Sequence, residues 1–304
     1  MDINYSDKIK VITDQSIADH LGECPIWNHV EQILYWEDLV RGILRSYCPK
    51  TKLVKSYPLT YPGGFIVNSE KGGLISGHKT GLVRLTLEPN FKEEKIEVYP
   101  LEGKEDKARF NDGKCDWQGR IWFGTADIKL EEPHAEYFML DSHLKLHNKE
   151  QNITIFNGPT FSLDSKYYFF ADSPKQTIYR CDLNKETGEL SNKIDYFKID
   201  QGFPDGATID SEGNLWWAIY DGSRILKIST KEDKGKLIGQ INVPITNPSS
   251  VCFGGENLDK LFVTSISYQS FFEKQLDFPN GGVLEIDMSS FGVKGVKEAF
   301  FKEF

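Results

Sequence analysis

One phrase in this sequence constrains the fold more than any other feature, because it recurs along the chain. Residues 109–125 read R-F-N-D-G-K-C-D-W-Q-G-R-I-W-F-G-T, which is a polar head, a turn and then a short apolar strand. Residues 204–216, P-D-G-A-T-I-D-S-E-G-N-L-W, repeat the same order of features. Residues 157–168, N-G-P-T-F-S-L-D-S-K-Y-Y, repeat it without the second glycine. A phrase that returns at intervals predicts a repeat architecture.

The spacing of the copies indicates which repeat architecture this is. Looser copies begin near residues 22, 63 and 248, so the chain carries six. Equivalent points in the six copies are Gly22, Gly64, Gly113, Gly158, Gly206 and Ser250. The steps between them are 42, 49, 45, 48 and 44 residues. Six repeats of about 40–50 residues, each long enough for four short strands, predict an all-β, six-bladed β-propeller.

The rest of the chain also reads as β-structure, because short runs of branched and aromatic residues alternate with turn residues. The clearest expected strands are 33–36, 43–47, 82–87, 121–123, 167–171, 215–219, 225–228 and 261–264. No linker interrupts them, so we expect one domain over residues 1–304. A β-sandwich is the alternative, since Asp-x-x-Gly turns join many kinds of strands. In a ring, a first strand near 9–13 would complete the sheet that holds 282–287 and remove its open edge.

Composition excludes several classes of function. The net charge of -9 argues against nucleic-acid binding and gives no attraction to anionic lipid. The five cysteines are widely spread without a C-x-x-C pair, so we expect buried, reduced thiols. The first residues lack the pattern of a signal peptide, and no apolar run approaches the roughly 18 residues of a membrane span. We therefore expect a cytoplasmic protein, a monomer or weak homo-oligomer, with no membrane or nucleic-acid partner.

Residues at the same phase of each repeat should lie at the same height around the axis of a ring. The phase beside the marker glycines carries Glu23, Asn111, Asp112, Asn157 and Asp205. These are all oxygen donors, which suit calcium, magnesium or manganese better than a soft metal. Taken singly, an Asp or Asn before Gly is an ordinary turn residue. The agreement of phase across repeats is what predicts a shared central pocket with a metal site.

The same segments resemble a known family. They are similar to the SMP-30/gluconolactonase/luciferin-regenerating-enzyme family, which includes regucalcin and bacterial sugar-acid lactonases. The similarity runs from about residue 15 to 300. It is carried by G-E-C-P-I-W at 22–27, R-F-N-D-G-K-C-D-W-Q-G-R at 109–120, N-G-P-T-F-S-L-D at 157–164, P-D-G-A-T-I-D-S-E-G-N-L-W at 204–216 and C-F-G-G-E-N at 252–257.

The resemblance implies a six-bladed propeller with one divalent cation on its axis. By position, Glu23, Asn157 and Asp205 match the family's metal ligands, and Arg109 and Asn111 match its substrate-holding pair. Asp112 is expected to support them. Calcium is the cation we expect, while zinc, manganese and iron(II) are compatible with an oxygen site that keeps open positions.

The resemblance also predicts a loop at residues 126–137 that covers the pocket. An acidic residue that contacts substrate in some relatives falls on Lys129 in this chain. Glu131 or Glu132 could take its place.

Our leading hypothesis is the metal-dependent hydrolysis of a sugar lactone to its open-chain acid. The metal would polarise the lactone carbonyl, and Asp205 would serve as general base as well as ligand. Arg109 and Asn111 would fix the ring in position. One alternative is a phosphotriester or other ester as substrate at the same site, which a more apolar pocket wall would favour. The other is a non-enzymatic calcium-binding regulatory protein, against which Arg109 argues, since a pure cation site has no use for a guanidinium.

Overall fold

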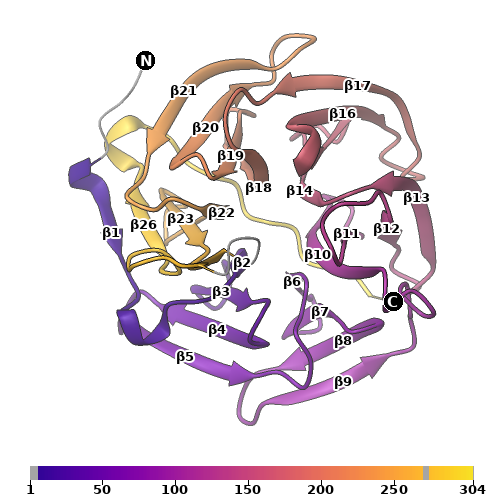
Figure 1. The fold of residues 1–304 in the computed structure, drawn as a ribbon, viewed down its shortest axis with the longest axis horizontal. Coiled ribbons are helices and arrows are strands. Elements are labelled where there is room, and N and C mark those ends of the chain that lie inside the picture. The colour runs from indigo at the N-terminus through magenta and orange to yellow at the C-terminus, as the bar shows by residue number, and fades with distance from the viewer. Residues whose placement is uncertain (1–5, 270–273, 304) are drawn as a thin grey trace.

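The predicted six-bladed β-propeller is confirmed. We describe a computed structural model covering residues 6–269 and 274–303. Within these residues, six four-stranded antiparallel sheets surround a central axis (Figure 1). Each sheet begins with a strand at the axis and ends with one at the rim. The only helical elements described are short 3-10 turns, and none of them could cross a membrane. Their bounds are Ser6–Lys8, Gln15–Ile17, Ser173–Lys175 and Ser289–Phe291.

The first three blades each use four consecutive strands. Blade 1 contains β2 (Gly22–Asn28), β3 (Ile33–Asp38), β4 (Ile43–Cys48) and β5 (Leu53–Pro58). Blade 2 contains β6 (Ile66–Asn68), β7 (Leu74–His78), β8 (Gly81–Thr86) and β9 (Lys92–Ile96). Blade 3 contains β10 (Ala108–Cys115), β11 (Ile121–Asp127), β12 (Ala135–Leu140) and β13 (Leu146–Ile153).

The last three blades follow the same order, except that blade 6 borrows a strand. Blade 4 contains β14 (Phe156–Phe161), β15 (Tyr167–Asp172), β16 (Thr177–Leu183) and β17 (Leu190–Lys198). Blade 5 contains β18 (Phe203–Ile209), β19 (Leu215–Tyr220), β20 (Arg224–Ser229) and β21 (Lys236–Asn242). Blade 6 contains β22 (Pro248–Gly254), β23 (Lys260–Ser265), β26 (Leu284–Asp287) and β1 (Ile9–Val11). A two-stranded hairpin pairs β24 (Tyr268–Gln269) with β25 (Lys274–Gln275).

The N-terminal strand closes the ring, as the sequence predicts. Strand β1 pairs antiparallel with β26, and Ile9 lies opposite Ile286. The pairing continues past the strand, because the N–H of Ile12 donates to the carbonyl of Val283 at 2.9 Å. The N–H of Val283 in turn donates to the hydroxyl of Thr13 at 3.0 Å. Blade 6 therefore joins the two ends of the chain and leaves no open edge beside blade 1.

The recurring turn has a common hydrogen-bonding scheme. The carboxylate of Asp116 is fully buried and accepts the indole N–H of Trp122 at 2.8 Å and the guanidinium Nε–H of Arg120 at 2.6 Å. The same carboxylate also accepts backbone N–H groups of the turn at 3.0 Å. In blade 5, Asp210 accepts the indole N–H of Trp216 at 2.9 Å in the same way. The repeated Asp-x-x-Gly-x-x-Trp pattern is thus one device that fixes a turn and orients the core tryptophan.

Removing this carboxylate should destabilise the fold. We expect Asp116→Ala to lower the free energy of unfolding by about 3 kcal/mol, because a buried guanidinium and indole N–H lose their acceptor. Denaturant unfolding measures the change. Asp164 is the matched control, since it sits in the equivalent turn of blade 4 with a half-exposed side chain. Asp164→Ala should change the free energy by less than about 0.5 kcal/mol, and equal losses would contradict the role of Asp116.

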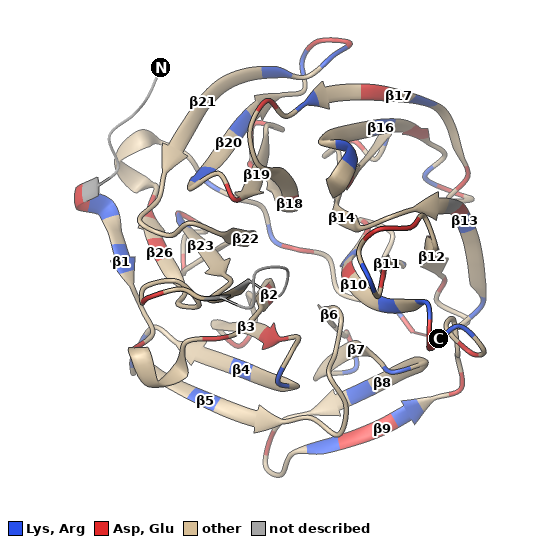
Figure 2. Ribbon diagram, in the orientation of Figure 1, with Lys and Arg blue, Asp and Glu red and all other residues tan. Residues whose placement is uncertain are grey.

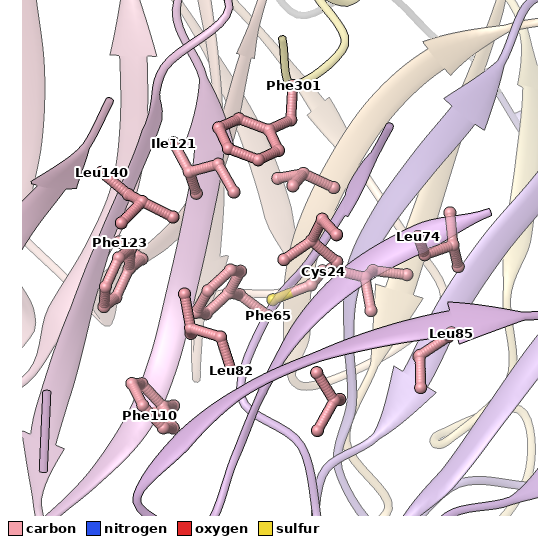
Figure 3. Close-up of a cluster of buried hydrophobic side chains, with 14 of the residues drawn as sticks. Cys24, Phe65, Leu74, Leu82, Leu85, Phe110, Ile121, Phe123, Leu140 and Phe301 are labelled. Atoms are coloured by element: carbon pink, nitrogen blue, oxygen red, sulfur yellow. The ribbon is translucent and has the colours of Figure 1, made fainter. Parts of the chain in front are cut away.

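The apolar core lies between neighbouring blades, and most charged residues lie outside it. The largest cluster of buried residues joins blades 1, 2 and 3, where Phe65 and Phe123 stack with ring centroids 4.9 Å apart (Figure 3). Figure 2 shows charged residues along the outer strands, while the inner ribbons are mostly uncharged. Outer strands such as β5 and β9 are correspondingly exposed. The ring therefore presents a polar rim and packs its blades through apolar faces.

Residues 293–303 form a strap across one face of the ring, and this strap runs diagonally across the middle of the ring to the C-terminus in Figure 1. Backbone hydrogen bonds tie it to blade 6 at Leu258 (2.8 Å), blade 5 at Ser211 (2.8 Å), blade 2 at Asn68 (2.8 Å) and blade 3 at Gly119 (2.9 Å). All four positions lie at or beyond the C-terminal ends of the inner strands. The ring of Phe301 is fully buried in the cluster shared by blades 1 to 3 (Figure 3). The strap therefore links four blades on one face.

A buried carboxyl sits between blades 1 and 2. Glu37 is fully buried, and the Ser76 hydroxyl donates to its Oε1 at 3.0 Å. Within the described residues its Oε2 has no hydrogen-bond partner. Burial raises the pKa of Glu37 to about 8, so the folded protein holds this side chain neutral.

This pKa shift predicts a pH-dependent stability. The contribution of protonated Glu37 to the free energy of unfolding is fully present below its unfolded pKa of about 4.3. This contribution is lost as the pH rises through about 8. The free energy of unfolding of Glu37→Gln relative to the wild type should therefore rise by roughly 3–4 kcal/mol between pH 5 and pH 8. Urea unfolding at several pH values tests this. Glu94→Gln on an exposed strand position should leave the pH profile unchanged.

Candidate active site

Bulges in the inner strands bring the predicted site residues to the axis. Glu23 in β2 pairs with Glu37 in β3, and Ile26 pairs with Tyr35. The segment of β2 between these pairs is therefore one residue longer than the segment of β3. The ladders of β14, β18 and β22 shift by one residue at the same phase, and β10 shifts between Phe110 and Asp112. The extra residue bends each strand and redirects its side chains. Five described inner strands thus place a bulge at the height where the predicted site residues occur.

The marker glycines of the sequence are equivalent only approximately. Gly158 and Gly206 lie inside their bulges, whereas Gly22 precedes one and Gly113 follows one. At the position after Glu23, the backbone of Cys24 adopts a positive φ of 51°, and the position after Asn157 has a φ of 62°. A non-glycine residue in this region stores strain, which is typical of functional sites.

The structure brings Glu23, Arg109, Asn111, Asn157 and Asp205 together in the lining of one cavity of about 500 Å³. They come from the inner strands of blades 1, 3, 4 and 5. Each lies near the N-terminal end of its strand, on the face opposite the strap. We call these five residues the polar floor.

Hydrogen bonds connect blades 3, 4 and 5 across the polar floor. The Arg109 Nη1–H donates to Asn111 Oδ1 at 2.7 Å, and Asn111 Nδ2–H donates to Asn157 Oδ1 at 2.8 Å. Asn157 Nδ2–H donates to the hydroxyl of Ser173 at 2.8 Å, and that hydroxyl donates to the carbonyl of Pro204 at 2.6 Å. Ser173 also lines the cavity, although its position after β15 carries no repeat signal in the sequence. These contacts fix the orientation of both amides.

The two carboxyls of the polar floor are crowded. Glu23 and Asp205 are hydrogen-bonded to one another. Burial, followed by the charge of Asp112, raises the pKa of Glu23. Burial and the neighbouring charge of Glu23 raise the pKa of Asp205 well above its usual range. Burial lowers the pKa of Arg109, an effect that the charges of Glu23 and Asp205 oppose. Two carboxyls are thus held close together in the polar floor, with the Arg109 guanidinium as the positive charge beside them.

Asp112 does not line the cavity. Its carboxylate accepts the backbone N–H of Gly113 at 2.7 Å and that of Gly158 at 2.8 Å, which joins blades 3 and 4. The thiol of Cys24 lies 3.6 Å from Asp112 Oδ1. This arrangement agrees with the supporting role that the sequence predicts for Asp112.

The donor set fits a hard divalent cation. In the part of the chain that the structure describes, no three His, Cys, Asp or Glu side chains gather as metal ligands. The polar floor instead offers two carboxyls, Glu23 and Asp205, with the amide oxygen of Asn157 as the third donor. Oxygen-only sets of this kind suit calcium, magnesium or manganese. A cation there would relieve the repulsion between the two carboxyls.

The loop above the cavity is shorter than the predicted segment 126–137. Strand β11 continues to Asp127 and β12 begins at Ala135, which leaves residues 128–134 as the loop. Leu130 lines the cavity from this loop, whereas Lys129, Glu131 and Glu132 are exposed. The loop is held by Asp127, whose Oδ2 accepts the N–H of Glu131 at 3.0 Å. The loop therefore presents Leu130 to the cavity, and the expected acidic contact from Glu131 or Glu132 is not found there.

Comparison with known proteins identifies the family. The model of the SMP-30/Gluconolactonase/LRE-like region matches residues 21–267, which include the whole polar floor. The chain belongs to this family. The predicted recognition is thus confirmed. Four of the five floor residues are ones that the sequence phase singled out, and the fifth, Arg109, was implied by the resemblance alone.

Relatives in the family match nearly the full chain. The 6-deoxy-6-sulfogluconolactonase of Pseudomonas putida is 30% identical over 264 residues, covering 86% of this chain and 89% of that protein. Regucalcin of Homo sapiens is 30% identical over 286 residues, covering 90% and 92%. The solved structure of a luciferin-regenerating enzyme is 30% identical with a TM-score of 0.86, and the match covers 97% of this chain and 99% of that one. These similarities favour a hydrolase acting on lactones at the level of the family.

Proposed function

We propose that this protein is a divalent-metal-dependent lactonase that hydrolyses a sugar lactone to the open-chain acid. The observation that carries the proposal is the convergence, on one cavity floor, of a crowded carboxyl pair with the Arg109–Asn111 pair. The first pair suits a cation, and in the second the amide of Asn111 accepts from Arg109 and so orients a guanidinium that lines the cavity. The printed name of the Pseudomonas putida relative, a sulfogluconolactonase, supports the same class of substrate. We further propose that residues 1–304 act as one domain, as a monomer or weak homo-oligomer.

Glu23, Asn157 and Asp205 would hold the cation. Calcium is the ion we favour, and zinc, manganese or iron(II) would also suit these donors. When bound, such a cation supplies Lewis acidity toward the lactone carbonyl oxygen.

The protein's own residues would position the substrate and move protons. Arg109 and Asn111 hold the ring through hydrogen bonds to its oxygens, so that the carbonyl carbon faces the attacking water. Asp205 takes the proton of that water as the new C–O bond forms. The ring C–O bond then breaks, and its oxygen leaves as a hydroxyl after taking the proton back from Asp205. The product acid releases one proton at neutral pH.

Two alternatives use the same site. A phosphotriester or other ester substrate is favoured by the apolar side chains around the cavity mouth, such as Leu21, Ile155 and Phe203. A calcium-binding regulatory protein would need only the carboxyl pair, and the half-buried Arg109 beside that pair argues against it.

A proton-release assay tests the proposal. The protein is incubated with five- and six-membered aldonolactones, before and after treatment with a chelator and after readdition of single metals. We expect lactone hydrolysis above background that the chelator removes and a divalent cation restores. Elemental analysis of the isolated protein identifies the bound ion. Hydrolysis that survives complete metal removal would overturn the metal dependence, and the absence of hydrolysis with every metal would overturn the lactonase proposal.

A further inference from the structure

The cavity has a second tier of residues above the polar floor, which we call the apolar tier. Side chains two residues apart in a strand point to the same side. Two residues before Glu23, Asn157 and Asp205 stand Leu21, Ile155 and Phe203, and all three line the cavity. In blade 3 the corresponding position, two residues before Asn111, is Arg109. Three of the four blades that build the polar floor thus place an apolar side chain directly above it.

Two residues from the outer turns extend this tier. Leu130 reaches the cavity from the loop at 128–134, and Ile266 reaches it from the segment after β23. Backbone bridges fix part of the tier, because Leu21 pairs with Ile266 and Ile155 pairs with Ala126. The apolar tier (Leu21, Leu130, Ile155, Phe203 and Ile266) is therefore built largely on paired backbone.

The side chains of the apolar tier keep exposed apolar surface that a bound ligand could cover. Phe203 is 37% exposed, and Leu21, Leu130 and Ile155 are half-buried, although each faces a cavity. The cavity volume of about 500 Å³ falls in the range that accommodates ligands of drug size. A simple sugar lactone is smaller than such ligands and carries hydroxyls on most of its carbons, so it would leave these side chains facing water or polar groups.

We propose that the substrate of this site is a lactone whose ring bears an apolar alkyl or aryl substituent covered by the apolar tier. This inference rests on the proposed lactonase function and names its substrate class. The polar floor needs the ring oxygens and the ester, because the charged groups of Arg109, Glu23 and Asp205 line that part of the cavity. The apolar tier needs a carbon-rich group that leaves the ring toward the mouth. A substituted lactone meets both requirements in one molecule.

A matched pair of substrates isolates the substituent. δ-Valerolactone and δ-decalactone share one ring, and the second carries a pentyl chain. Each methylene buried against apolar side chains contributes roughly a factor of 4 to kcat/KM. Burial of two or more methylenes therefore predicts that kcat/KM for δ-decalactone exceeds that for δ-valerolactone by at least about 10-fold.

Variants of the apolar tier locate the effect. Phe203→Ala and Leu130→Ser should each lower the decalactone-to-valerolactone ratio of kcat/KM by about 3- to 10-fold. The two residues come from different blades, so a disturbance of one strand does not explain both results. Leu237→Ala is the matched control, because Leu237 is 46% exposed on β21 and does not line the cavity. It should leave both the ratio and the basal rate unchanged.

The possible results separate this inference from the function on which it rests. Turnover of both lactones with a ratio near or below 1 would overturn the apolar-substituent proposal and leave the lactonase proposal standing. A high ratio that Phe203→Ala and Leu130→Ser do not change would also overturn it, since the preference would then arise elsewhere. No turnover of any lactone, including the aldonolactones, would overturn both proposals. Faster hydrolysis of an aryl phosphotriester than of δ-decalactone would assign the apolar tier to that class instead.

Discussion

Asp205→Ala should lower kcat/KM for lactone hydrolysis by about 1,000-fold or more, while the protein stays folded. General-base catalysis alone contributes about 10²–10⁴-fold, and this substitution also removes one of the three metal donors that we propose. Asp205 contacts Glu23 within the polar floor, so its loss leaves Glu23 as the one carboxyl among the five floor residues. Steady-state kinetics together with circular dichroism of the folded variant measure the outcome. A variant with wild-type turnover would remove Asp205 from the mechanism.

A second substitution of Asp205, with a matched control, separates its role as metal ligand from its role as general base. Asp205→Asn keeps an oxygen donor but cannot accept a proton, so we expect it to retain metal measurably while losing turnover. Metal content by elemental analysis, compared with kcat, distinguishes the ligand role from the base role. Asp200 is the matched control, because it lies in the same connection before β18 with its side chain exposed. Asp200→Ala should keep wild-type kinetics.

Deletion of residues 293–304 should remove most of the stability of the fold. The strap contributes backbone hydrogen bonds to four blades and fills the core beneath blades 1 to 3 with Phe301. Loss of a fully buried phenylalanine alone costs about 3–5 kcal/mol, and a protein of this kind has only about 5–15 kcal/mol to lose. We therefore expect the truncated chain to unfold at low denaturant concentration or to accumulate in insoluble form.

A pair of adjacent residues tests the strap without deleting it. Phe301 is fully buried, whereas Phe300 is half-buried and packs against His29 with ring centroids 4.8 Å apart. Phe301→Ala should lower the free energy of unfolding by about 3–5 kcal/mol, and Phe300→Ala by about 1 kcal/mol. Denaturant unfolding of the two variants gives the comparison. Equal costs would show that the strap does not anchor the core through Phe301.

The repeat made much of the fold predictable. The Asp-Gly-Trp phrase marks the blades because its carboxylate holds both a turn and an indole, as Asp116 and Asp210 show. The closure by the first strand followed from the need to cover an edge. The convergence of the polar floor also followed from phase, since residues at equal heights in a ring must meet at its axis. These features depend on local patterns that the sequence repeats.

Other features left no such pattern. The bulges add one residue to the inner strands, so the marker glycines occupy different positions relative to the floor. Cys24 has a left-handed backbone although it is not a glycine, so the sequence does not indicate this conformation. The strap occurs once, so no comparison between blades indicates its path. The apolar residues two positions before the floor were visible in the sequence, but their meaning depends on knowing which way the bulged strands face.

The inner-strand bulges have a consequence for how this protein could acquire new chemistry. At each bulge, one residue stands outside the regular pairing of the inner strand with its neighbour. The floor side chains Glu23, Asn157 and Asp205 line the cavity, whereas other positions of the same strands, such as Ile26 and Ile209, build the interblade core. Exchanging a floor residue therefore leaves the scaffold's sheet pairing intact. Mutational drift or directed selection can vary the reaction at the axis while the ring that presents it persists.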